Sequence, residues 1–179
     1  AQQAKDLRLA AWWAEAAARV DGYPGLAEGV ALYAGLCEAF WGEVHPQPEG
    51  GDAELRIGSI SWLLGQVSAF ARQLPVLQHG ELRCSLAELG QLKQRTRGED
   101  EEAARAARDT LERAQRGTPP ARLLQVLESA RHITRTLEAL QTLVDARLGA
   151  DGPAFVAARE AMQDAVAGIE RVATELGVI

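Results

Sequence analysis

Apolar residues recur at intervals of three and four over most of the chain, and this spacing restricts the possible folds more than any other feature of the sequence. The longest run contains Leu123, Leu127, Ala130, Ile133, Leu137, Leu140, Val144 and Leu148. Residues with this spacing lie on one face of an α-helix. No stretch alternates apolar and polar residues for long enough to predict a β-strand. The spacing therefore predicts an all-α fold, an antiparallel helical bundle of about seven helices.

The last part of the chain predicts two long helices. Thr118-Pro119-Pro120 supplies a cap and a first turn for a helix that reaches Leu148. After a short glycine-containing linker, Pro153 begins the last helix, whose larger apolar residues fall seven apart: Phe155, Met162, Ile169 and Leu176. Long helices joined by a short loop fold back on each other. We therefore expect a long antiparallel hairpin over residues 118–179.

Prolines and glycines divide the first half of the chain into further helices. A first helix over residues 6–20 ends at Gly22-Tyr23-Pro24, and a second ends at His45-Pro46, because the residue before a proline disfavours helical geometry. A third begins after Asp52, its expected cap, and stops at Pro75. The expected buried stripe of the second helix is Leu26, Val30, Tyr33 and Cys37. Each of these helices thus has one apolar face for a core.

Two weaker helices are predicted between residues 85 and 117. Ser85 and Glu88 have capping-box spacing and start a short helix, after a predicted loop at Gln78-His79-Gly80. A run of acids, residues 99–102, opens the next helix, and its arginines follow: Arg105, Arg108, Arg113 and Arg116. Acids first and bases last complement the helix dipole. Because its apolar residues are mostly alanine, we expect this helix to be a surface connector.

The aromatic residues predict a division of the chain into parts. Only Phe155 lies in the second half; the others are Trp12, Trp13, Tyr23, Tyr33, Phe40, Trp41, Trp62 and Phe70. We expect an aromatic-cored helical bundle over residues 1–97, a surface connector helix over 98–117 and an aliphatic hairpin over 118–179.

Charge and composition exclude several functional classes. The net charge of −6 gives no electrostatic footprint for nucleic acid. No apolar run is long enough to insert into a membrane, and the amino terminus lacks the pattern of a secretory leader. Cys37 and Cys84 lie far apart, and we expect both to be reduced, as in the cytoplasm. Because the chain starts without an initiator Met inside a predicted helix, we expect it to be part of a longer protein.

No motif in the sequence predicts catalysis, a metal or a cofactor. His45, His79 and His132 lack the HxxxH and HExxH spacings of zinc sites. Phosphate-binding and nucleophile motifs are also missing, and close helix packing explains Gly22, Gly25, Gly29 and Gly35 better than a phosphate loop does. An enzyme is therefore the weakest hypothesis, and protein–protein contact is the strongest.

Trp12 and Trp13 are the first candidates for such contact. Adjacent helical residues point about 100° apart, so we expect one ring in the core and the other at a helix boundary or a partner surface. The other candidates are Trp62 and the arginines of the connector helix, Arg105, Arg108, Arg113 and Arg116.

Several motifs in fixed order resemble the ImpA N-terminal domain of TssA-type proteins, which belong to the bacterial type VI secretion system. The residues that carry the resemblance are Asp6-Leu7-Arg8, Gly22, Gly25-Leu26, Gly29, Phe40-Trp41, His45-Pro46 and Arg56. Later matching pieces are Leu74-Pro75-Val76, Cys84 to Leu89, Gly152 to Phe155, and Arg159.

The resemblance implies a non-enzymatic, cytoplasmic assembly component that contacts the baseplate, tube and sheath. It assigns structural roles to the motif residues between Asp6 and Arg56. It also implies that the family's opening segment and its ring-forming C-terminal part are missing from this chain, and that the full-length protein forms a homo-oligomer through the latter. The alternative hypothesis is a helical adaptor unrelated to secretion that dimerises through its C-terminal hairpin.

Overall fold

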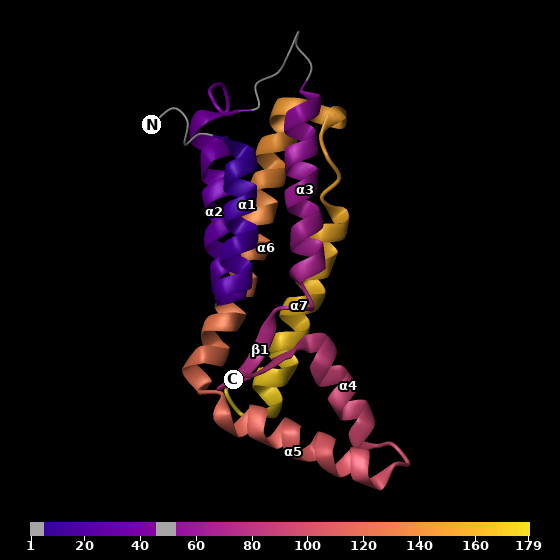
Figure 1. Ribbon diagram of the computed structural model, residues 1–179. Helices are drawn as coiled ribbons and strands as arrows, with labels where there is room; N and C mark the ends of the chain where they lie inside the picture. The colour runs from indigo at the N-terminus through magenta and orange to yellow at the C-terminus, as the bar shows by residue number, and fades with distance from the viewer. Residues whose placement is uncertain (1–5, 46–52) are drawn as a thin grey trace.

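The computed structural model describes residues 6–45 and 53–179, and in these ranges it contains seven α-helices and one small antiparallel sheet (Figure 1). The all-α prediction is confirmed, apart from this sheet. The elements in chain order are α1 (Leu7–Asp21), α2 (Tyr23–Phe40), α3 (Glu54–Phe70), β1 (Pro75–His79), β2 (Leu82–Ser85), α4 (Leu86–Thr96), α5 (Glu101–Gly117), α6 (Pro120–Leu148), the 3-10 turn η2 (Gly149–Asp151) and α7 (Val156–Glu175).

The helices form an elongated bundle, and we call the β-hairpin, α4 and α5 at its lower end in Figure 1 the foot. In Figure 1, α1, α2, α3 and α6 run alongside one another, and α7 returns antiparallel to α6 as the sequence predicts. Helix α1 packs on α2 and α3, α2 packs along α6, and α3 packs against α7. The β-hairpin, α4 and α5 lie together at the lower end, with α5 across it.

Glycines allow α1 and α2 to approach each other closely. Gly22 makes the turn between them with φ +68°, a conformation that side chains disfavour. A Cβ added to Gly25 would overlap the Ala17 carbonyl, and one added to Gly29 would overlap the backbone of Ala14. Close packing therefore explains these two glycines, as the sequence predicts, whereas Gly35 faces open space.

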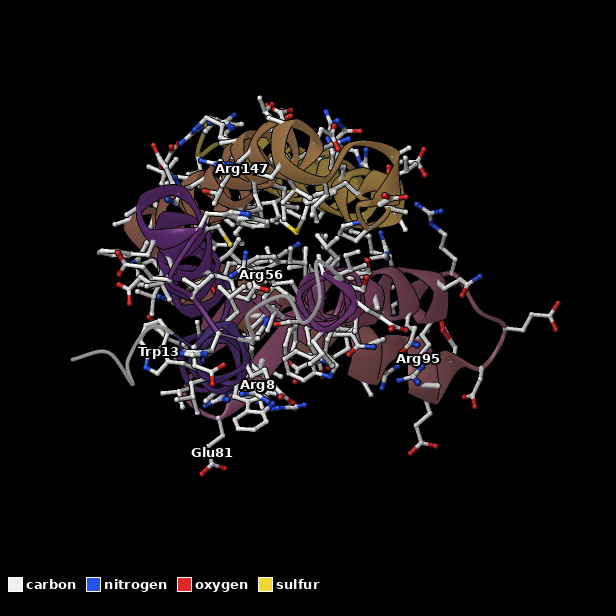
Figure 2. All side chains as sticks on the ribbon, turned by 90° about the horizontal axis from the view of Figure 1, so that it is seen from above. Arg8, Trp13, Arg56, Glu81, Arg95 and Arg147 are labelled. Atoms are coloured by element: carbon white, nitrogen blue, oxygen red, sulfur yellow. The ribbon has the colours of Figure 1, made fainter. Side chains whose placement is uncertain are left out.

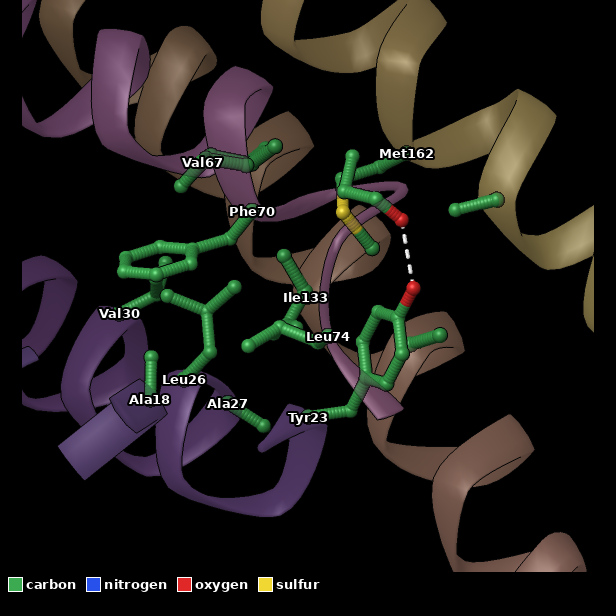
Figure 3. Close-up of a cluster of buried hydrophobic side chains, with 14 of the residues drawn as sticks. Ala18, Tyr23, Leu26, Ala27, Val30, Val67, Phe70, Leu74, Ile133 and Met162 are labelled. Carbon is green, nitrogen blue, oxygen red and sulfur yellow. Dashed lines mark hydrogen bonds between the residues drawn. The ribbon is translucent and has the colours of Figure 1, made fainter. Parts of the chain in front are cut away.

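One hydrophobic core runs through the bundle and includes residues from every α-helix. The stripe predicted for α2 is fully buried, and so is the stripe of α6 as far as Val144. Figure 3 shows how Leu26 of α2, Val67 of α3 and Ile133 of α6 meet near Met162 of α7. The Tyr23 hydroxyl donates a hydrogen bond to the Ala71 carbonyl, which satisfies the polar end of a buried ring. This core crosses residues 97 and 118, where the sequence suggests separate parts.

The β-hairpin corrects the prediction of a loop at residues 78–80. β1 and β2 pair antiparallel, with His79 opposite Leu82 and a register irregularity between Pro75 and Leu77. Gly80 adopts φ +61° and makes the tight turn. Strands of five and four residues are too short for alternation to be visible in the sequence.

Some predicted helix ends also shift. α2 stops at Phe40, and the chain turns there with the Val44 N–H donating to the Phe40 carbonyl. α7 begins at Val156 and not at Pro153. The predicted cap Asp52 and Pro46 lie outside the described residues. The capping box of α4 is confirmed, since the Ser85 hydroxyl and the Glu88 carboxylate each accept a bond from the other residue's N–H.

Candidate protein-contact surfaces

Several of the family-motif residues meet where α1 and α3 begin, whereas Gly22, Gly25 and Gly29 lie along the α1–α2 contact toward its other end. Asp6 caps α1 by accepting a hydrogen bond from the Arg8 N–H at 2.8 Å, and its carboxylate also pairs with the Arg8 guanidinium at 3.0 Å. These bonds outweigh the effect of partial burial and lower the pKa of Asp6. The next N–H, of Leu7, donates to the His45 carbonyl at 2.8 Å. The start of α1 is therefore tied to the chain that follows α2.

Arg56 adds the start of α3 to this junction. Its guanidinium is buried among the helices, donates to the Val44 carbonyl at 2.8 Å and lies 4.7 Å from the centre of the Trp41 ring. Burial lowers the pKa of Arg56, but the group remains a cation. Figure 2 shows Arg56 in the middle of the bundle. These contacts connect the start of α1, the end of α2 and the start of α3.

Trp12 and Trp13 are both exposed, so the prediction that one ring lies in the core is wrong. Their exposed fractions are 58% and 46%. The core side of α1 is built from small residues, Ala10, Ala11, Ala14 and Ala18, together with Leu7. Because α2 approaches this side closely, an indole would not fit there. Figure 2 places Trp13 at the edge of the bundle, pointing away from it.

The two rings belong to a longer apolar surface, which we call the outer face of α1. Its members lie three or four positions apart and are all exposed: Leu9, Trp12, Trp13, Ala16 and Val20. At about 100° per residue they share one side of the helix, opposite the buried alanines. Leu9 and Val20 were not among the sequence candidates. Their spacing from Trp13 is the signal that could have identified them.

Trp62 lies on α3 and is 37% exposed. Leu55, one heptad earlier on the same helix, is 58% exposed. This pair forms a second, smaller apolar surface.

The four arginine candidates all lie exposed on α5, within the foot. Arg116 pairs with Glu112 at 2.9 Å and Arg113 with Asp109 at 3.6 Å, and Arg108 donates to the Thr96 carbonyl at 3.4 Å. Four acidic residues on the helix balance the arginines: Glu101, Glu102, Asp109 and Glu112. The outer side of α5 is therefore a mixed charged surface, not a basic patch. Its buried side consists of Ala104, Ala107 and Ala114.

The described residues offer little that suggests chemistry. No group of three or more His, Cys, Asp or Glu side chains within residues 6–45 and 53–179 could hold a metal ion. Burial raises the pKa of the Cys37 thiol to about 12, so this thiol stays protonated at neutral pH. A hollow of about 430 Å³ near the β-hairpin is lined in part by Arg19, Arg83, Arg122 and Glu88. Among all the residues that the structure describes, no helix combines the length and the apolar character that a membrane span requires.

Comparisons with known proteins give one consistent result. A family model described as "ImpA, N-terminal, type VI secretion system" matches residues 1–65. A solved structure of the TssA N-terminal domain from Burkholderia cenocepacia, including its conserved ImpA_N region, is similar over most of the chain. The two are 34% identical with a TM-score of 0.79, and the match covers 97% of this chain and 73% of that one. The comparison with curated proteins gave no match.

Proposed function

This chain belongs to the TssA family of type VI secretion system components, and on that premise we propose that it is a non-enzymatic, cytoplasmic assembly element that contributes to building the baseplate and the tube and sheath. Because the chain belongs to a family of secretion components, the alternative hypothesis of a helical adaptor unrelated to secretion is rejected. The observation that carries the proposal is the likeness to a TssA N-terminal domain over 97% of the chain.

The proposed mechanism is positional. A single core connects all seven helices, so a contact made on one helix is held rigidly relative to the others. The exposed surfaces provide groups suited to protein partners, because tryptophan and arginine are enriched where proteins bind each other. Trp62 and the arginines of α5 are proposed to face other secretion components, while nucleic acid and membrane insertion play no part.

The rest of the proposal concerns the full-length protein. There, a C-terminal part beyond this chain is proposed to form the homo-oligomer on which these helical arms are carried. Asp6, His45 and Arg56, which meet where α1 and α3 begin, are proposed to keep these helices rigid. Their bonds to neighbouring backbone groups support this role.

A capture experiment with purified components tests the proposal. The tagged chain is incubated with baseplate, tube and sheath proteins of the same secretion system, and bound proteins are identified after washing. We expect at least one component to bind, and we expect Trp62→Ala or Arg113→Ala combined with Arg116→Ala to weaken that binding about tenfold. Glu81→Gln, an exposed change on the β-turn, is the control. If no component binds the wild-type chain, or if these variants bind as it does, the proposed contacts are wrong.

A further inference from the structure

Helix α1 is apolar on two opposite sides. Its alanine side packs against α2, while its outer face carries two tryptophans, a leucine and a valine in solvent. Apart from the terminal Asp21, the charged side chains are confined to one strip formed by Arg8, Glu15 and Arg19. A surface helix normally presents one apolar stripe to the core and a polar face to water. The outer face of α1 therefore has the character of a second packing surface.

The size of this face is compatible with an interface. Leu9 is 50% exposed and Val20 is 84% exposed, in addition to the half-exposed indoles of Trp12 and Trp13. Since a tryptophan presents up to about 250 Å², the five side chains leave on the order of 500 Å² of apolar surface in water. Two such faces together reach about 1,000 Å², near the lower limit for specific protein–protein interfaces.

We propose that the outer face of α1 binds the same face of a second copy of this chain, with the two α1 helices antiparallel. A twofold axis midway between Trp13 and Ala16 would place each Trp13 opposite Ala16 of the second copy. It would also place each Leu9 opposite Val20 of the second copy. The face thus has large and small side chains arranged so that it is complementary to itself, as an isologous interface requires. The small Ala16 leaves room for the indole and lets the helices approach.

The charges beside the face are compatible with a second copy and give no attraction for a strongly charged partner. In a twofold pair each charged strip lies near its own copy, so a strip of one sign would repel itself. Here Arg8 pairs with Asp6 at 3.0 Å and Arg19 pairs with Glu15 at 2.9 Å, which leaves the strip nearly neutral. A face selected for a strongly charged partner would instead carry an uncompensated charge.

This inference does not depend on the proposed function. It assigns the outer face of α1 to self-association and leaves Trp62 and α5 available for other components. If the purified chain is monomeric but still captures a secretion component, the inference fails and the proposed function stands. The opposite pair of results would retain the dimer and reject the proposed contacts.

Sedimentation equilibrium of the complete 179-residue chain tests the proposal directly. Over about 1 to 100 µM we expect a reversible monomer–dimer equilibrium, and we expect Trp13→Glu to raise the dissociation constant at least about tenfold. Val156→Glu is the matched control, because Val156 is 61% exposed but lies at the start of α7. A wild-type chain that is monomeric throughout, or a dimer that Trp13→Glu does not weaken, overturns the proposal.

Cross-linking tests the antiparallel arrangement. The native thiols Cys37 and Cys84 are buried, so a short bismaleimide reacts mainly with an introduced cysteine. We expect Ala16→Cys, close to the proposed twofold axis, to give covalent dimer, and Ala139→Cys, exposed on α6, to give little. Equal yields from the two variants, or dimer that forms only after a secretion component is added, would contradict a self-complementary α1 face. Circular dichroism verifies that each variant is folded.

Discussion

Helices α1 and α5 use the same packing device but present opposite surfaces to solvent. Each turns a row of alanines toward a neighbour: Ala10, Ala14 and Ala18 in α1, and Ala107 and Ala114 in α5. On the far side, α1 carries tryptophans whereas α5 carries paired charges. An alanine row therefore fixes how closely a helix packs but does not determine what the rest of the helix does. The residues on the far side determine whether that side of the helix remains in water or is suited to a further protein partner.

The largest effect is expected where α1 meets α2. Gly25→Ala places a Cβ against the Ala17 carbonyl and forces the helices apart, so we expect a loss of about 2 kcal/mol or more in the free energy of unfolding. Gly35→Ala is the matched control, because it adds a methyl group in open space within the same helix. It should stabilise the protein by up to about 1 kcal/mol. Urea denaturation measures both values, and equal effects would show that the close approach is unimportant.

The corresponding change in the foot should have a smaller and more local effect. Ala114 is fully buried, so Ala114→Leu overpacks the base of α5 and should cost about 1 to 2 kcal/mol. We expect faster amide hydrogen exchange in α4 and α5 and little change in α1 and α2. Ala106→Leu, on the exposed side of α5, is the control. Exchange that increases uniformly would indicate that the foot and the bundle unfold together.

Removing the N-terminal cap of either α1 or α5 should lower the free energy of unfolding by about 1 kcal/mol. Asp6→Ala removes both the cap of α1 and the pair with Arg8, so it should cost slightly more than Asp100→Ala, which removes the cap of α5. Because folding lowers the pKa of Asp6, its contribution is complete above the unfolded value and is lost as the pH falls through the folded value. Denaturation at pH 7 and near pH 3 should therefore show the Asp6→Ala difference shrinking. A difference that grows in acid would have the wrong sign.

The smallest effect is expected on the charged side of α5. Arg113→Ala breaks an exposed pair with Asp109, and such pairs contribute less than about 0.5 kcal/mol. The midpoint of thermal unfolding should be almost unchanged, and high salt should reduce the difference further. A large loss would mean that the outer side of α5 is part of the fold and not a free surface.

The spacing of apolar residues along the chain predicted the buried stripes of the long helices. The stripes of α2 and of α6 as far as Val144 lie in the core, as their spacing predicts. The prediction for Trp12 and Trp13 rested instead on the angle between adjacent helical residues, and it failed because α1 has two apolar sides. Gly25 and Gly29 on the next helix indicate which side packs, since glycines make room for alanines and not for indoles.

Other features depend on contacts that spacing along the chain does not reveal. Asp6, His45 and Arg56 come from three separate segments, and only the family resemblance grouped them before their packing was known. The sequence did not predict the β-hairpin, because its strands are short and its turn depends on the single Gly80. The self-complementarity of the outer face of α1 likewise emerges only once its alanine side is known to be covered.

Thr118 has a consequence for how this fold can vary. Its hydroxyl oxygen lies 2.8 Å from the Gln78 nitrogen and 2.7 Å from the Ala114 oxygen, which fastens the end of α5 to β1. The ring of His79 also lies directly against Gly117. The chain between these two points therefore begins and ends at nearly the same place. Its exposed turn between α4 and α5 can be lengthened during evolution or by protein engineering while the bundle keeps its shape, whereas Leu86 and Leu89 belong to the core and hold α4 in position.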